Sequence, residues 1–221
     1  MNNKIKNINF NHSFIFFLFC NIFSLFTLKI NSVSISPLIC LFLILSIGIS
    51  HGSLDNYKGK KLFQIFGINN FLIFYLTYLL IALIVIIFWI IIPHISLIIF
   101  LIVASYHFGK EDTQFLITKN TYNYQLLFLL KGSLIIVAPI YFHFDETISI
   151  FKLLLIENES FYNFLELIET TKVLLYAIIL STLSNILLFA KNFELKKFAI
   201  FFDFISIIII NYYFSPLIAF T

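Results

Sequence analysis

The sequence predicts an all-α, polytopic membrane protein: a single transmembrane helical domain over residues 1–221, with about seven spans and an incomplete further one. Hydrophobic residues make up 61% of the chain and charged residues 11%, and the mean hydropathy is +1.01. A soluble domain is only about 45–50% apolar. The apolar residues also fall into runs that, as helices, cross a hydrocarbon core of about 30 Å. Helices are expected because lipid cannot pair exposed backbone groups and the alternating pattern of a β-barrel is absent.

The spans are expected at the longest apolar runs. The first run follows Lys4 and Lys6 and is expected to remain as a helix, because it has no small-residue cleavage site. Pro93-His94 predicts a tight connection between the third and fourth runs. The acidic segment 144–172 is expected to contain an interfacial helix. The runs are 13–28, 33–50, 71–92, 94–108, 124–143, 173–190 and 198–214.

The lysines predict the orientation of the helices. All 14 basic residues are lysines, and they form no basic stripe, so no nucleic-acid partner is expected. With a cytoplasmic N-terminus, ten of the 14 lysines fall in cytoplasmic segments. Because cytoplasmic loops are enriched in lysine, we expect a multi-pass protein of the inner (plasma) membrane with its N-terminus in the cytoplasm.

Two of the five histidines are candidate metal ligands. His51 lies in SHGSLD at 50–55 and His107 in SYHFGKED at 105–112. Each closes an apolar run, is followed by a glycine within two residues, and has a carboxylate about one helical turn later. A polar ring at membrane depth is costly and usually has a binding role. Neutral imidazole binds iron, copper or zinc well. Gly52 and Gly109 are expected to let backbones or a bound substrate approach closely where each helix ends. The remaining histidines are expected at solvated or interfacial positions: His12, His94 and His143.

The residues alone leave two interpretations open. His51, His107 and one carboxylate would form the facial triad of a non-haem iron oxygenase. Alternatively, the histidines only cap helices in a non-enzymatic membrane protein, such as a small transporter or scaffold. Zinc-protease chemistry is disfavoured because His-Glu-x-x-His is absent. The carboxylates available as a ligand, or as groups that orient the imidazoles from the second shell, are Asp55, Glu111 and Asp112.

The histidine segments resemble those of the Brp/Blh family of membrane β-carotene 15,15′-dioxygenases. HGSLD at 51–55 is similar to the family's His-Gly-Ala-x-Asp, with Ser53 in place of alanine. HFGKED at 107–112 is similar to its His-Phe-Gly-x-x-Asp. KGSLIIVAPIYFH at 131–143 is similar to a basic-Gly stretch that leads to Ala-x-Pro and a histidine. The resemblance runs from about residue 41 to the end of the sequence.

The resemblance implies a non-haem Fe(II) enzyme that uses O₂ to cleave the central double bond of β-carotene into two molecules of retinal, which are passed to a rhodopsin. It implies four iron-binding histidines: His51, His107 and a His-x-x-x-His pair on a later helix. That helix would begin within 215–221, so this sequence does not contain the pair. Half of the iron site is therefore expected here, in a fragment, a truncated product or a decayed enzyme. The facial triad and the four-histidine site remain alternatives.

Overall fold

The computed structural model describes residues 3–27, 36–68, 70–114, 116, 122–154, 158–190 and 194–220, except for the side chains of 37, 47–56 and 71. These residues form helices and no strand, which confirms the all-α prediction. The elements are α1 (Asn3–Thr27), α2 (Pro37–Ile65), α3 (Phe71–Ile91), α4 (Pro93–Thr113), α5 (Tyr122–Phe142), α6 (Phe144–Leu153), α7 (Glu159–Thr170), α8 (Val173–Ala190), the 3₁₀ helix η1 (Leu195–Lys197), α9 (Phe198–Tyr213) and α10 (Pro216–Phe220).

Several of these helices are long and apolar enough to cross a membrane. Within the described residues there are five: Asn3–Thr27, Leu72–Ile91, Pro93–Thr113, Tyr122–Phe142 and Val173–Ala190. Their outward-facing side chains are largely isoleucine, leucine, valine and phenylalanine. Such surfaces are stable in lipid and aggregate in water. The chain is therefore a helical membrane protein, as the composition predicts.

The helices form two compact units, and the smaller comprises residues 34–97 and 220–221. In it, α2 packs against α3 through the ring of Phe74, which lies over Gly59 and meets Phe63 edge-on at a centroid distance of 5.6 Å. Gly67 takes a positive φ of 75° after α2 ends, a conformation that glycine adopts at no steric cost. Asn70 then begins α3, where its side-chain oxygen accepts a hydrogen bond from the backbone N–H of Leu72.

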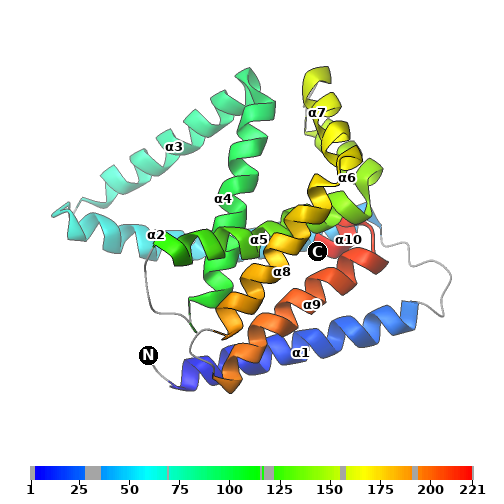
Figure 1. The fold of residues 1–221 in the computed structure, drawn as a ribbon. Helices are drawn as coiled ribbons and strands as arrows, with labels where there is room; N and C mark the ends of the chain where they lie inside the picture. The colour runs from blue at the N-terminus through cyan, green and yellow to red at the C-terminus, as the bar shows by residue number, and fades with distance from the viewer. Residues whose placement is uncertain are drawn as a thin grey trace. The chain divides into compact units, whose positions relative to one another are not determined.

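The larger unit comprises residues 1–33 and 98–219, and α1 lies along α9 in it (Figure 1). The contact face of α1 carries Ser13, Cys20 and Ser24, which are all buried. On α9 the facing residue Ser206 is also fully buried. Small side chains let two helix backbones approach closely, which compensates for the lack of a hydrophobic driving force in lipid. Phe202 of α9 packs against three rings of α1: Phe10, Phe14 and Phe17.

Helix α5 is central to the larger unit, because it packs against α6, α8 and α9 (Figure 1). Its buried residues include Phe128, Leu134 and Ala138. Polar α8 side chains lie on the same interface, with Ser181, Ser184 and Asn185 buried. Serine and asparagine at membrane depth are stabilised by hydrogen bonds to neighbouring backbone carbonyls, and Asn185 donates one to Ser181 O at 2.8 Å.

The acidic segment 144–172 forms two helices, α6 and α7, where the sequence analysis anticipated one. Helix α6 begins after His143, whose Nε2 lies 2.9 Å from the carbonyl oxygen of Asn211 in α9. Helix α7 is amphipathic: Phe161 and Leu165, four residues apart, are buried, whereas the acidic residues of the helix lie on its other faces. His143 therefore has a structural contact with α9.

Two lysines contact residues that flank the segment between α8 and α9. Lys6 of α1 forms an ion pair with Glu194, with 2.7 Å between Nζ and Oε2. Lys197 is buried and donates a hydrogen bond from Nζ to Leu188 O near the end of α8, at 3.0 Å. Burial lowers the pKa of Lys197, and the hydrogen bond from Lys6 lowers the pKa of Glu194 below its ordinary value of 4.5.

Enlarging a small residue between α1 and α9 should destabilise the larger unit. Ser206→Leu adds a side chain that the buried contact cannot accommodate, so we expect a loss of about 1–3 kcal/mol in the free energy of unfolding. Thermal unfolding in detergent, followed by circular dichroism, measures the change. The control is Ile205→Leu at the next position, which is 37% exposed and should change the midpoint little. Equal midpoints for both variants would contradict the packing described.

The Lys6–Glu194 pair should make stability depend on pH in the acid range. Because the pKa of Glu194 is lowered in the folded state, the pair stabilises the fold above pH 4.5, and this contribution disappears as the pH falls through the lower folded value. Glu194→Gln should therefore lower the unfolding midpoint at pH 6 and lose its effect in strong acid. Lys6→Met should behave in the same way, and the double variant should add nothing further. A constant difference across the whole pH range would exclude this ion pair as the cause.

Candidate metal centre

His107 and Glu111 form a histidine–carboxylate pair on one face of α4. The two atoms His107 Nε2 and Glu111 Oε2 are 3.1 Å apart, and the His107 side chain is 60% exposed. Residues four apart on a helix share a face, so this pair follows directly from the local sequence. The ring of Phe108 meets the imidazole at 5.8 Å between centroids. An imidazole and a carboxylate, two metal-binding groups, thus lie side by side on an accessible surface.

The helices that carry the candidate histidines continue beyond the apolar runs. The fourth run ends at residue 108, but α4 extends to Thr113, and α2 likewise extends past His51 to Ile65. Lysine and glutamate in the sequence after His107 are good helix formers. The hydroxyl of Thr113 donates a hydrogen bond to Gly109 O at 2.6 Å. The histidines therefore lie within helices, whereas the apolar pattern placed them at helix ends.

The opposite face of α4 is in very close contact with α5. A Cβ atom on Gly109 would overlap the carbonyl oxygen of Phe128, and one on Gly132 would overlap that of Ser105. Tyr106 adds a hydrogen bond from its hydroxyl to Gln125 Oε1 of α5. The predicted close approach at Gly109 is confirmed. Only glycine fits at both positions, because two helix backbones touch there.

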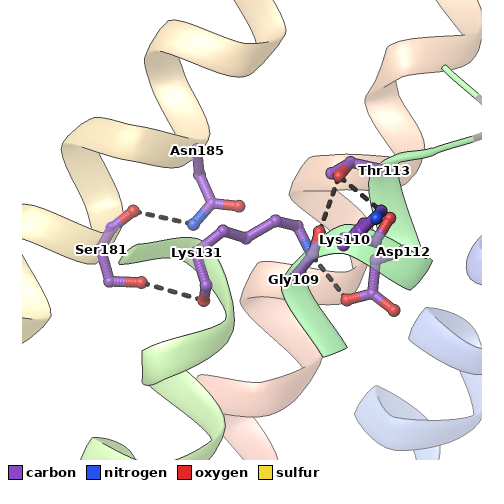
Figure 2. A network of polar contacts seen from close by, with 7 residues as sticks. All are labelled: Gly109, Lys110, Asp112, Thr113, Lys131, Ser181 and Asn185. Carbon is purple, nitrogen blue, oxygen red and sulfur yellow. Dashed lines mark hydrogen bonds and ion pairs between the residues drawn. The ribbon is translucent and has the colours of Figure 1, made fainter. Parts of the chain in front are cut away.

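Asp112 and Lys131 form a second pair at this crossing, and it links α4 to α5. The Lys131 ammonium is 2.6 Å from Asp112 Oδ2; its side chain is 3% exposed and that of Asp112 is 32% exposed. Figure 2 shows the Lys131 side chain extended from α5 towards Asp112. Behind it, Ser181 Oγ of α8 donates to Lys131 O at 3.4 Å. Asp112 is thus directed to α5, on a different face of α4 from His107.

Asp203 of α9 adds a second carboxylate near the same ammonium. It accepts a hydrogen bond from the Ser13 hydroxyl of α1 and interacts electrostatically with Lys131 and Asp112. The sequence analysis gave Lys131 and Asp203 no role. The signal that could have found them is a charged residue within an apolar run, because such a residue in a membrane usually faces the protein interior and a partner of opposite charge.

The structure brings some of the predicted site residues together. His107 lies with Glu111, and Asp112 lies with Lys131. His51 and Asp55 are four residues apart in α2, and their side chains lie outside the described residues, as does Gly52. No group of three His, Cys, Asp or Glu side chains that could hold a metal ion is present within the described part of the chain.

The other histidines have different surroundings. His12 is exposed on α1, and His94 is partly buried in the first turn of α4. The His143 ring contacts a backbone carbonyl, as described above.

The donor chemistry at His107 fits a non-haem iron. Imidazole and carboxylate groups are the ligand types of the facial triad and related iron sites. Metal-binding histidines usually use one ring nitrogen for the metal and the other for a carboxylate or carbonyl. Since Glu111 takes Nε2 of His107, Nδ1 is the atom through which this residue would bind a metal.

The fold and the site define a polytopic helical membrane protein with a histidine–carboxylate pair where an apolar run of a spanning helix ends. Among protein families, residues 42–221 match the model described as "Beta-carotene 15,15'-dioxygenase". That stretch is most of the chain and contains both histidine segments, so the chain belongs to this family, and its family resemblance is confirmed. The family's function is of the carotene-dioxygenase type and implies β-carotene as substrate. Comparison with curated proteins and with solved structures found no match.

Replacing Gly132 should separate α4 from α5. Gly132→Ala places a Cβ against the backbone of α4 at Ser105, which cannot move without shifting the helix, so we expect a loss of about 1–3 kcal/mol in unfolding free energy. The control is Ser133→Ala at the adjacent position, whose hydroxyl donates a hydrogen bond within its own helix, to Leu130 O. Thermal unfolding in detergent compares the two variants. A Gly132→Ala protein as stable as Ser133→Ala would show that the helices are not in contact there.

Proposed function

We propose that this protein is an iron-dependent enzyme that cleaves β-carotene at its central 15,15′ double bond and releases two molecules of retinal. The family match over residues 42–221 is the observation that carries the proposal. The His107–Glu111 pair supports it, because it supplies donor types that ferrous iron takes. The second substrate is O₂, whose two atoms are added across the cleaved bond, one to each retinal aldehyde.

We assign His107 and His51 as ligands of the Fe²⁺ ion. Bound iron would supply the capacity to activate O₂, which a carbon–carbon double bond does not react with unaided. Glu111 orients the His107 ring by holding Nε2, and this contact leaves Nδ1 for the metal. Asp55 stands at the same spacing after His51 and is assigned the corresponding role. Asp112 is held by Lys131, and we assign it the indirect role of fixing the position of α4.

The substrate and the membrane determine how the site is reached. β-Carotene is a hydrocarbon dissolved in the bilayer, so it enters sideways from lipid between helices. Phe108, beside the imidazole of His107, offers an aromatic surface for the polyene. The lysine distribution favours a cytoplasmic N-terminus in the inner (plasma) membrane, which places both histidine segments on the cytoplasmic side. Retinal released into the bilayer would then be available to a rhodopsin.

Retinal formation in a bacterial host that accumulates β-carotene tests the function. The protein, expressed from its gene, should deplete β-carotene and produce retinal, measured by chromatography of rapidly extracted cells. Under ¹⁸O₂, each retinal should carry one heavy oxygen. His51→Ala and His107→Ala should abolish the product, because each removes an iron ligand. His12→Ala, at an exposed position on α1, is the matched control and should leave retinal formation unchanged.

Each negative result of these experiments would contradict a different part of the proposed function. Retinal that persists in His51→Ala or His107→Ala would overturn the ligand assignment. Retinal without heavy oxygen, when water exchange is controlled for, would exclude a dioxygenase. A purified protein that holds no iron and forms no retinal would point instead to the non-enzymatic membrane protein.

A further inference from the structure

The rotation of α4 about its axis decides where His107 points. At about 100° per residue, His107 and Glu111 both lie about 160° from Gly109 around the helix. The residues that contact α5 lie within about 60° of Gly109 on the other side: Ser105, Tyr106 and Asp112. Whatever holds this second group against α5 therefore also sets the direction of the histidine–carboxylate pair.

The glycine contact by itself does not fix this rotation. Gly109 and Gly132 set how closely the two backbones approach, but glycine has no side chain that resists turning. The Lys131–Asp112 pair does resist it, because rotation of α4 would pull Asp112 Oδ2 away from the Lys131 ammonium, which is 2.6 Å away on a side chain that is only 3% exposed. Lys131 is in turn fixed through its backbone, where Ser181 of α8 donates to its carbonyl oxygen (Figure 2).

We propose that Lys131 is a positioning residue for the metal centre. Through Asp112, it holds α4 in the rotation that presents His107 and Glu111 together on the face away from α5. This inference rests on the proposed function, since it assumes that His107 binds the metal.

Lys131 also determines which carboxylate of α4 is available to the metal ion. Glu111 and Asp112 are adjacent in the sequence, and a carboxylate is a good oxygen donor for divalent metals. The ammonium of Lys131 engages Asp112, and Glu111 alone is left beside the imidazole. Without Lys131, Asp112 would be free to compete for the ion, and the ligand set would change.

Cobalt binding tests the proposal on the whole 221-residue chain, purified in detergent. Co²⁺ replaces Fe²⁺ and reports its ligands by its visible absorption spectrum. Lys131→Met keeps most of the side-chain volume and removes the charge; it should weaken Co²⁺ binding about tenfold or more and shift the spectrum, as the loss of supporting residues around metal ligands typically does. The control is Lys110→Met, an exposed lysine of α4 near the Tyr106 ring, which should leave both unchanged.

Two further variants separate positioning from general stability. The double variant Asp112→Asn/Lys131→Met leaves one carboxylate, Asp203, without the ammonium, where the single variant leaves two. It should therefore fold more readily than the single variant, and it should still show the shifted spectrum. The exchange Asp112→Lys/Lys131→Asp should restore part of the affinity and the native spectrum. A residue with a merely structural role would change the unfolding midpoint alone. Native affinity and spectrum in folded Lys131→Met or in the double variant would overturn the proposal.

A second readout does not depend on metal. In metal-free protein labelled with ¹⁵N-histidine, the His107 signal is assigned by its loss in His107→Gln. It should shift in the double variant and stay in place in Lys110→Met. A wild-type protein that binds no Co²⁺ would contradict the proposed function, and the His107 signal would still report on positioning. An unchanged signal in the double variant would contradict the positioning role itself.

Discussion

The close contact between α4 and α5 is the constraint on which the candidate site depends. Gly109 and Gly132 place two helix backbones directly against each other, and no side chain larger than hydrogen fits at either position. In lipid, helix association gains little from the hydrophobic effect, so packing and interhelical polar contacts hold such pairs together. The ion pair between Asp112 and Lys131 lies beside this contact and provides the polar part. The contacts of α4 with α5 therefore determine the direction in which His107, on the opposite face of α4, points.

A buried ion pair is a poor way to gain stability. Removing two charges from water costs several kcal/mol each, and apolar residues of similar size often stabilise a protein equally well or better. Ionisable residues within membrane helices are costlier still, and those that remain usually have a function. Lys131 has Asp112 and Asp203 as neighbours of opposite charge, on α4 and α9 respectively. What this arrangement provides is a defined geometry of three helices, which the proposed metal centre would need.

The sequence predicts the helices and the local pairs, but not the contacts between helices. Apolar runs located helices, because such runs depend on residues close together in the chain. The contact of His107 with Glu111 is equally local, since it follows from the four-residue spacing once the segment is helical. The runs did not locate the helix ends, since α4 continues through charged residues that are good helix formers. The partner of Asp112 was also not predictable. It comes from another helix, and the rotation that joins them depends on the glycine contact.

The spacing of the carboxylates now distinguishes residues that the sequence alone left equivalent. Asp55, Glu111 and Asp112 all follow a candidate histidine by about one helical turn. Glu111 is four residues after His107 and contacts it, whereas Asp112 is five residues after it and faces α5. Asp55 is four residues after His51, within the continuous helix α2, so its register is that of Glu111. Both segments thus place a carboxylate four residues after a histidine in the sequence, a spacing at which a carboxylate on a helix can orient a metal-binding imidazole. Asp112 instead pairs with Lys131 and helps to hold α4 against α5.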